Sequence, residues 1–245
     1  MIVFVESLQD ANTEIHRNFI MAVKDTPSAI ISTNYDILID NRLAEVNCIN
    51  YGAKLRYPLV WGYMMKGGMA RARLSGDEHL NFGNVSLLKI HGSLNWLYCR
   101  KCDEVDITIG TKAVDNSRHV LYCADAGCTN TYEHLLITPT MFKNYENRFI
   151  RQVWERAEQA LIEANKLVFI GYALKEEDYQ IRCLLMKALL NKSATYGDVM
   201  VVEKRPETKA DEATIAEIRN KYTQLYGDVQ VKAMGFKEYV NSMKG

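Results

Sequence analysis

Residues 29–38 of the 245-residue chain contain the pattern that decides the fold: Ala-Ile-Ile-Ser-Thr-Asn-Tyr-Asp-Ile-Leu. The apolar run Ala29–Ile31 predicts a short strand, and the polar residues 32–36 that follow it predict a turn. Ile37 and Leu38 then begin an amphipathic helix. A short strand without polar residues is typical of a parallel sheet that helices cover on both faces.

The same alternation of apolar runs and helical periods recurs along the chain. Apolar residues at helical spacing predict the helices, which are expected at 15–23, 145–164, 181–188 and 211–226. Further strands are expected at 85–90, 135–137, 167–170, 199–202 and 229–233. This alternation predicts the α/β class, here a doubly wound, Rossmann-like parallel sheet. Residues 50–84, which six glycines interrupt, are expected to be loop-rich with at most short helices.

The composition argues against several classes of protein. The chain has 30 Lys+Arg and 30 Asp+Glu, whereas binding to nucleic acid or to a membrane surface needs a basic excess. Apolar residues make up 48% of the chain, which is typical of a soluble globular protein. The longest strongly apolar stretch, Leu167–Leu174, is much shorter than the roughly 20 residues of a membrane-spanning helix. Nothing after Met1 resembles a secretory signal, so a cytoplasmic location is expected, and oligomer formation stays open.

Four of the six cysteines are close together in the sequence and predict a metal site. They form two short-spaced pairs: Cys99, Cys102, Cys123 and Cys128. In a reducing compartment such pairs indicate tetrahedral zinc, and four thiolates leave no open position for catalysis, so the zinc would be structural. Free buried thiols are the alternative, and His119 or His134 could replace one cysteine. The predicted zinc-ribbon-like module covers 97–131, inserted into a domain formed by 1–96 and 132–245.

Polar residues follow three of the predicted strands. They are residues 32–36, His91-Gly92-Ser93, and Gly171–Leu174 with the acidic pair Glu177-Asp178 after it. Because parallel strands bring their carboxyl ends to one crevice, these groups are expected to meet there. Each group also has a plainer explanation: residues 32–36 could cap a helix, and His91 could be structural.

These motifs resemble those of the sirtuins. Residues 32–36 are similar to the Thr-Gln-Asn-x-Asp motif, and closer to the Thr-Asn-Tyr-Asp form of the bacterial sirtuin-like branch. His91-Gly92 matches the His-Gly pair that holds the sirtuin catalytic histidine, and the four-cysteine module follows it, as in sirtuins. Gly171–Leu174 resembles the later Gly-Thr/Tyr-Ser-Leu turn. The motifs occur in the family order across roughly residues 15–205.

The resemblance implies that NAD is a substrate. Asn34 would lie near the nicotinamide ribose, Asp36 would support the nicotinamide end, and His91 would act as a base on a ribose hydroxyl. A neutral imidazole, with an ordinary pKa of about 6.5, can accept a proton near neutral pH. The residues that the resemblance assigns to NAD binding are Ser32, Thr33, Asn34, Asp36, Gly92, Gly171, Tyr172 and Glu203.

Three functions are compatible with these motifs. Attack by water would release nicotinamide and ADP-ribose, and the bacterial form of the motifs favours this hydrolysis, in a setting such as anti-phage defence. Attack by an acetyl-lysine oxygen would make the chain a protein deacylase with an acylated peptide as partner, which the cysteine module favours. The third function is a non-catalytic remnant that binds a partner.

Three departures from the sirtuin pattern bear on activity. The family opens with a strand and a Gly-Ala-Gly-x-Ser phosphate loop, whereas the first glycine here is Gly52. The chain is therefore expected to lack its first nucleotide-binding unit and to hydrolyse NAD slowly or not at all. Ala173 also stands where the turn usually has Ser, and Glu203 stands near where the family often offers Asn.

Overall fold

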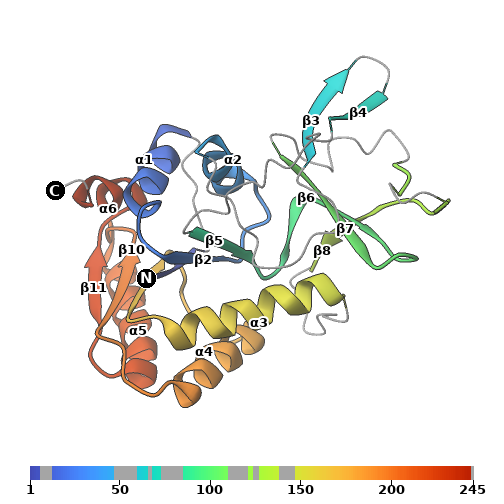
Figure 1. The fold of residues 1–245 in the computed structure, drawn as a ribbon. Coiled ribbons are helices and arrows are strands. Elements are labelled where there is room, and N and C mark those ends of the chain that lie inside the picture. Colours follow the sequence, from blue (N-terminus) through green and yellow to red (C-terminus); the bar gives the residue numbers. More distant parts are fainter. Residues whose placement is uncertain are drawn as a thin grey trace.

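The structure is a computed structural model with a large parallel sheet and a smaller second sheet (Figure 1). The residues that it describes are 1–5, 13–46, 60–65, 68–72, 85–109, 121–123, 127–137 and 147–243. None of the helices in these ranges is both long and apolar enough to cross a bilayer.

The large sheet has six strands in the order β11-β10-β9-β1-β2-β5, and all of its pairings are parallel. Its strands are β1 (Ile2–Val5), β2 (Ser28–Ser32), β5 (Val85–Lys89), β9 (Lys166–Ile170), β10 (Asp198–Glu203) and β11 (Gln230–Ala233). The chain moves outward from β1 to β5, then returns to the other side of β1 with β9. This is the Rossmann strand order, with its switch point between β1 and β9, and it confirms the predicted fold class.

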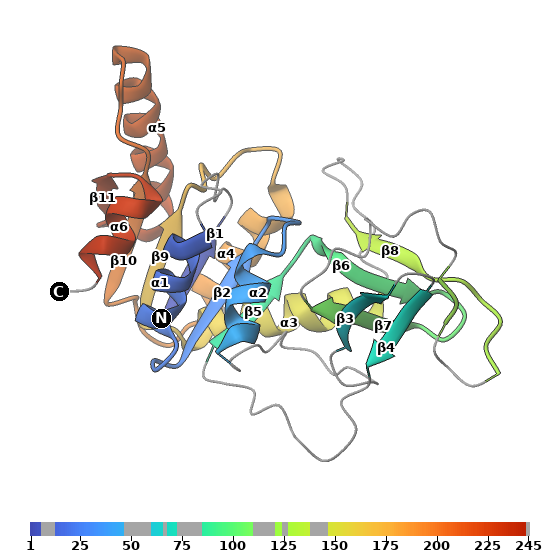
Figure 2. The same ribbon diagram turned by 90° about the horizontal axis from the view of Figure 1, so that it is seen from above.

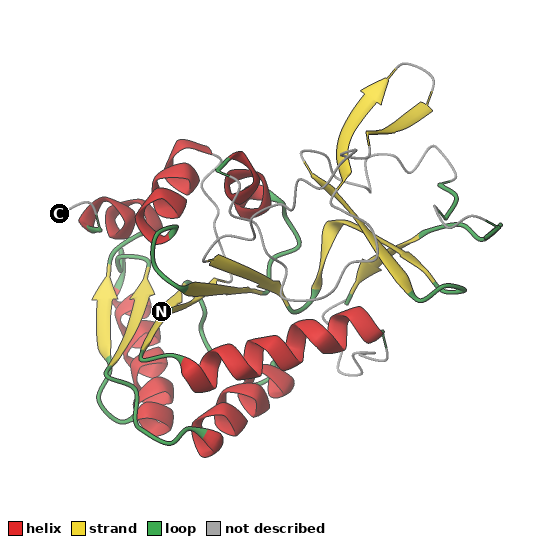
Figure 3. Cartoon of the chain, in the orientation of Figure 1, coloured by secondary structure: helices red, strands yellow, loops and turns green. Residues whose placement is uncertain are grey.

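Helices cover both faces of this sheet, as Figure 3 shows in red. On one face lie α1 (Thr13–Val23), α2 (Leu38–Glu45) and α6 (Phe236–Ser242), and on the other α3 (Arg148–Glu163), α4 (Tyr179–Asn191) and α5 (Lys209–Tyr226) (Figure 1). The central strands are therefore buried on both sides: from Leu167 to Ile170 no residue is more than 2% exposed. This burial explains the continuous apolar runs in the sequence.

Local side-chain contacts set where two of the long helices begin. Asn147 accepts a hydrogen bond from the backbone N–H of Ile150 at the start of α3. At the start of α5, the Thr208 hydroxyl accepts from the N–H of Asp211, whose carboxylate accepts in return from the N–H of Thr208. These caps pair N–H groups that the first turn of a helix would otherwise leave free.

The second sheet has five strands in the order β4-β3-β7-β6-β8. Its strands are β3 (Val60–Met65), β4 (Gly68–Ala72), β6 (Gly92–Cys99), β7 (Glu104–Ile109) and β8 (Glu133–Leu136). Figure 2 shows this sheet beside the first, at the opposite end from α5 and α6. α3 reaches it, because the Phe149 ring packs edge-on against Trp96 with 4.9 Å between ring centroids.

Two expectations need correction in this part of the chain. The hairpin of β3 and β4 lies within residues 50–84, which were expected to form loops with at most short helices. Gly62 and Gly68 lie inside these strands, and a glycine in a strand hides the alternation of apolar and polar residues. The run at 135–137 was expected to return to the parallel sheet, but β8 pairs with β6 in the second sheet. The domain boundaries proposed from the sequence stay a prediction.

The start of the chain differs from its prediction as well. Ile2–Val5 forms β1, which the sequence analysis did not assign, and β1 pairs with both β2 and β9 at the centre of the sheet. The strand and the helix, α1, with which a Rossmann fold begins are thus present. What the chain lacks there is the glycine-rich sequence, because residues 6–12 contain no glycine.

Candidate active site and metal centre

Five parallel strands end in one row across the sheet. In the strand pairing Lys89 lies beside Ser32, Ser32 beside Val5, Val5 beside Ile170, and Ile170 beside Val202. The strands are parallel, so the segments that follow these residues all leave the sheet on the same side. The candidate residues predicted from the strand ends therefore share one edge of the sheet.

The order of strands fixes how far apart these candidates lie. β2 and β5 are neighbours, so Asn34 and His91, each two residues past the row, leave the sheet on adjacent strands. Glu203 is the last residue of β10, which is four strand positions from β5. Neighbouring strands lie about 4.8 Å apart, so His91 and Glu203 are separated by about 19 Å along the edge. An elongated ligand is needed to contact both.

His91 lies on the short link between the two sheets. It follows Ile90, after β5 of the large sheet, and directly precedes β6 of the second sheet. The backbone N–H of Ile137, just past β8, donates to the His91 carbonyl oxygen at 2.9 Å. The indole N–H of Trp154 on α3 donates to the Ile90 carbonyl oxygen at 2.8 Å. The link is thus held from two sides, and His91 is only 5% exposed.

The residue after His91 has to be glycine. Gly92 has φ +82°, and a Cβ atom at this position would lie 2.1 Å from the carbonyl oxygen of Leu135. Backbone atoms of the neighbouring strand β8 occupy the space that any side chain would need. The His-Gly pair thus has a physical reason: the close approach of β6 and β8 sets the direction in which the chain leaves His91.

Tyr35 is a part of the site to which the sequence analysis gave no role. Its ring lies 6.5 Å from the His91 ring, and its hydroxyl donates to the carbonyl oxygen of Ile137. Its own carbonyl oxygen accepts from the N–H of Leu94 at 2.9 Å. Burial, together with the negative charge of Asp178, raises the pKa of Tyr35. The start of α4, where Asp178 lies, therefore belongs to the same region.

The other residues of the first motif make local contacts. Ser32 and Thr33 are buried, and the Ser32 hydroxyl accepts from the N–H of Asn34 at 3.2 Å. A carboxylate oxygen of Asp36 accepts from the N–H of Leu38 at 3.0 Å, at the beginning of α2. The cap residue of α2 is Ile37, without a side-chain cap, so Asp36 contacts the first N–H of the helix from one residue further back, while Asn34 is half-buried at the edge.

The third motif forms a turn that is packed beneath α5. Gly171 has φ +63°, and its N–H donates to the Val202 carbonyl oxygen at 3.0 Å. Tyr172 is completely buried; its carbonyl oxygen accepts from the Tyr222 hydroxyl at 2.7 Å, and its own hydroxyl lies 3.4 Å from an Asp178 carboxylate oxygen. The contacts of Tyr172 that the structure describes are with the protein, and its predicted part in cofactor binding stays a prediction.

Within the described residues, two hollows lie near these elements. The smaller one, of 150 Å³, is lined by Glu203 and, from the start of α5 and the segment before it, by Lys204, Arg205, Asp211, Thr214, Ile215 and Ile218. Glu203 therefore borders an open space at the far end of the row. The larger hollow, of 370 Å³, lies between α3 and α4 and has a mainly apolar lining that includes Trp154, Tyr179 and Cys183. None of the predicted site residues lines it.

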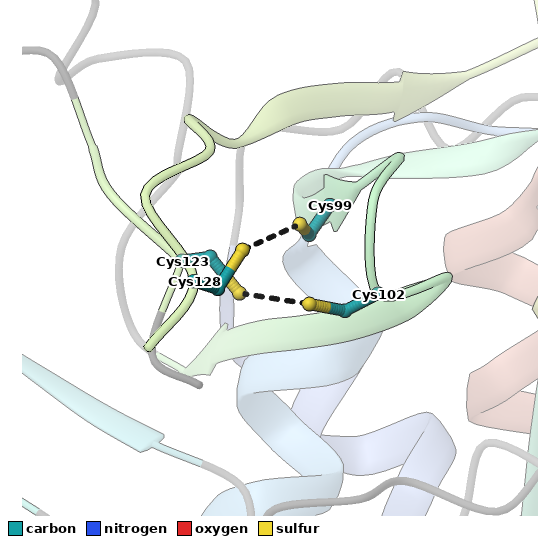
Figure 4. Close-up of side chains that lie close together, drawn as sticks. All are labelled: Cys99, Cys102, Cys123 and Cys128. Carbon is teal, nitrogen blue, oxygen red and sulfur yellow. Dashed lines mark hydrogen bonds between the residues drawn. The ribbon is translucent and has the colours of Figure 1, made fainter. Parts of the chain in front are cut away.

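The four predicted cysteine ligands do converge (Figure 4). Their sulfur atoms all lie within 4.8 Å of one another, with 3.8 Å between Cys99 and Cys128 and 3.9 Å between Cys102 and Cys123. A tetrahedral zinc with Zn–S bonds of about 2.3 Å places its sulfurs about 3.8 Å apart. A disulfide needs about 2.0 Å, so the cluster fits zinc and not paired disulfides. Four sulfur ligands would close the coordination shell, which is typical of a structural zinc.

The cluster is built from two turns. Cys99 ends β6, and Asp103, with φ +52°, turns the chain into β7 just after Cys102. The second turn is closed by the N–H of Cys123, which donates to the Asn130 carbonyl oxygen at 2.8 Å. Burial raises the pKa of the Cys99 thiol, but hydrogen bonds, first from the Cys102 backbone, lower it to about 7 overall.

The histidines that were weighed as alternative ligands are not in the cluster that the structure describes. His134 is exposed on β8, and the group of potential metal ligands found within the described ranges consists of the four cysteines. His119 lies outside the described residues.

Comparison with known proteins identifies a family over most of the chain. A family model described as the SIR2-like domain matches residues 28–226, from the first residue of β2 to the last residue of α5. No curated protein matches the chain. Among solved structures, the chain is similar to Sir2Tm bound to a propionylated peptide, with 13% identity, 93% of this chain and 68% of that chain covered, and a TM-score of 0.46. It is also similar to Sir2 with a p53 peptide and NAD+, with 13% identity, 93% and 67% covered, and a TM-score of 0.46. A structure on sirtuin substrate affinity gives 12% identity, 98% and 90% covered, and a TM-score of 0.48.

Proposed function

Because the chain belongs to the SIR2-like domain family, we propose that it consumes NAD by hydrolysing the bond between nicotinamide and ribose. The observation that carries this proposal is the row of strand ends, with Asn34 and His91 toward one side of it and Glu203 toward the other. Rossmann-type sheets bind dinucleotides across the carboxyl ends of their strands at the switch point. On this proposal Asn34 and His91 hold the nicotinamide ribose, and Glu203 holds the adenosine end.

The proposed hydrolysis requires a general base that is shielded from bulk water. In the hydrolysis the bond between C1′ of the ribose and the nicotinamide nitrogen breaks, and nicotinamide leaves with the bonding electrons. The oxygen of a water molecule forms the new bond to C1′, so the products are nicotinamide, ADP-ribose and one proton. His91 is assigned as the base on a ribose hydroxyl, because a neutral imidazole accepts protons near neutral pH and because its burial keeps it in place.

The sequence between β1 and α1 bears on the rate. Glycines at this point in a Rossmann unit let backbone N–H groups approach a pyrophosphate closely. Residues 6–12 contain none, so fewer backbone donors are expected at the phosphates. Each hydrogen bond to a charged group contributes about 1.5–3 kcal/mol, so the loss of two weakens NAD binding by on the order of a hundredfold or more. We therefore expect slow turnover.

The cysteine cluster favours a second candidate, an NAD-dependent protein deacylase. The cluster joins two turns of the second sheet, and the strand β6 of that sheet directly follows His91. In this reaction an acyl-lysine oxygen takes the place of water in the attack on C1′. A role in anti-phage defence belongs to the hydrolase proposal and stays a prediction.

The experiment measures nicotinamide and ADP-ribose released from NAD by the zinc-loaded chain, with and without an acetyl-lysine peptide. The hydrolase proposal predicts slow release that the peptide does not change. His91→Ala should lower the release at least about a hundredfold, since a general base contributes about 10²–10⁴-fold. The control is His134→Ala, a change at an exposed histidine on β8, which should have no effect.

Each other outcome identifies a different function. Nicotinamide release that requires the peptide, together with transfer of the acetyl group, would indicate the deacylase. Release that His91→Ala leaves unchanged would refute the assigned mechanism. No release under any condition would support the non-catalytic alternative.

A further inference from the structure

A buried ion pair lies directly behind the candidate site. Lys89, the last residue of β5, and Asp40, in α2, are each 1% exposed. The Lys89 Nζ lies 3.1 Å from a carboxylate oxygen of Asp40 and also donates to the backbone carbonyl oxygen of Asp36. One ammonium group thus joins the strand that leads to His91 with both the first turn of α2 and the segment before it.

The contacts of Lys89 act on the turn that carries Asn34. We call Asn34–Asp36 the Asn34 turn. On the side before His91 this turn is held by Lys89, through the Asp36 carbonyl oxygen. On the side after His91 it is held by the N–H of Leu94, which donates to the Tyr35 carbonyl oxygen at 2.9 Å. The segment with His91 therefore contacts the Asn34 turn on both sides of the histidine, through Lys89 before it and through Leu94 after it.

The cost of burying two charges indicates that the Lys89–Asp40 pair has a role other than stabilising the fold. Taking two charges out of water costs several kcal/mol per ion, and apolar residues of similar size are often as stable or more stable in the same place. Leu87, two residues before Lys89 and on the same face of β5, and Leu43, one helical turn after Asp40 in α2, are also at most 1% exposed, so the pair has buried apolar neighbours on both of its elements. What an apolar pair could not do is donate a hydrogen bond to the Asp36 carbonyl oxygen, and so fix the turn.

We propose that Lys89 is a positioning residue that fixes the Asn34 turn relative to His91, with Asp40 holding its ammonium group in place. The proposal deepens the proposed function, on which its catalytic consequence rests. Nζ donates one hydrogen bond to the backbone of the turn and pairs with a carboxylate on the helix that the turn begins. The turn and the helix are thereby locked to the end of β5.

The test replaces the pair without leaving a lone buried charge. Lys89→Met alone would leave the Asp40 carboxylate buried without its partner and could prevent folding. The main variant is therefore the double change Lys89→Met with Asp40→Leu, which removes both charges and keeps the branched four-atom side chain at position 40. The matched control is Lys192→Met. Lys192 also donates to backbone carbonyl oxygens, those of Ile162 and Ala164, but it lies at the far end of α4.

The first readout is amide hydrogen exchange, which needs no NAD. The N–H groups of Leu94 and Leu38 report on the turn, because they donate to Tyr35 and to Asp36. In the folded double variant these two amides should exchange at least about tenfold faster, while the amides of β9 keep their protection. Lys192→Met should leave both unchanged. Unchanged exchange at Leu94 and Leu38 in the double variant would overturn the proposal.

The second readout separates positioning from a merely structural role. If the turn shifts relative to His91, kcat for nicotinamide release should fall about 10–100-fold while KM changes much less, since small misplacements act on the transition state. The pH profile should keep its shape, because His91 itself is retained. A kcat equal to that of the wild type, despite faster exchange, would also overturn the proposal. Absence of NAD turnover in the wild type would refute the proposed function, whereas the exchange measurement still decides whether Lys89 fixes the turn.

Discussion

The phenol ring of Tyr35 and the imidazole ring of His91 lie 6.5 Å apart, centroid to centroid, with 30° between their planes. One backbone unit joins them: the N–H of Ile137 donates to the His91 carbonyl oxygen, and the carbonyl oxygen of Ile137 accepts from the Tyr35 hydroxyl. Ile137 directly follows β8 of the second sheet. The second sheet thus sets the spacing of two residues that the large sheet brings to its edge.

The cysteine cluster should stabilise the turns of the second sheet that contain it. Cys102→Ser removes one of four sulfur ligands, and zinc binding energy is also folding energy for the turns around it. We expect the zinc content, measured by elemental analysis, to fall from one per chain to well below one, with a lower Tm. The control is Cys183→Ser on α4, outside the cluster, which should retain the metal. A wild-type protein that contains no zinc, or a Cys102→Ser variant with the same Tm as the wild type, would contradict the prediction.

The sequence predicts the large sheet well where local patterns are sufficient. β2, β9 and β10 are short apolar runs next to amphipathic helices, and each occurs where it was expected. β1 was missed although its four residues, Ile2–Val5, form an apolar run like those of the other strands. Its central place comes from pairing with β2 and β9, which lie far from it in the sequence, and a local pattern cannot predict non-local pairing of this kind.

The candidate site also has parts that local sequence patterns predict and parts that depend on packing. That Asn34 and His91 share an edge follows from two apolar strands of one parallel sheet, and the pairing of β2 with β5 bears it out. Lys89 was not singled out, because a lysine at the end of a strand is usually exposed, and only the packing of α2 shows that it is buried against Asp40. The hydrogen bond from the Tyr222 hydroxyl on α5 to the Tyr172 carbonyl oxygen likewise depends on packing that the motif does not predict.

Two tyrosines on α5 provide a matched test of buried hydrogen bonds. The Tyr222 hydroxyl donates to the Tyr172 carbonyl oxygen at 2.7 Å, whereas the Tyr226 hydroxyl is buried without a hydrogen-bond partner in the described part of the chain. Tyr222→Phe should lower the free energy of unfolding by about 1–3 kcal/mol, because it leaves a buried carbonyl oxygen with one partner fewer. Tyr226→Phe should leave it unchanged or raise it. Urea unfolding checks both, and equal losses would contradict the assignment.

Tyr196 should make the stability fall at high pH. Burial raises the pKa of its phenol from 10.0 to about 12. Between these values the unfolded chain has lost the phenol proton while the folded chain retains it, so the unfolded state binds fewer protons and the free energy of unfolding falls as pH rises. The contribution is complete below pH 10 and is lost as the pH passes about 12. Unfolding measured from pH 9 upward should show a shallower decline for Tyr196→Phe than for the wild type; identical slopes would refute this.

Gly92→Ala should be far more damaging than the same change at a glycine with similar φ. Gly92 and Gly227 have φ +82° and +79°, but a Cβ at Gly92 meets the Leu135 carbonyl oxygen at 2.1 Å, while at Gly227 it meets nothing within 4 Å. Gly227→Ala therefore measures the backbone strain alone, about 1–3 kcal/mol. Gly92→Ala adds a clash with the backbone of β8, so its loss in the free energy of unfolding should exceed that of Gly227→Ala by at least about 2 kcal/mol.

The Gly92 clash should also be felt at the site, because relieving it requires β6 and β8 to separate and so moves His91 and Ile137 relative to each other. We expect nicotinamide release by the folded fraction of Gly92→Ala to fall at least about tenfold, and that of Gly227→Ala, at the end of α5, to match the wild type. Urea unfolding and product release, both measured on the same preparations, check this. If the two variants lose equal stability, the close approach of β6 and β8 does not explain why glycine follows His91.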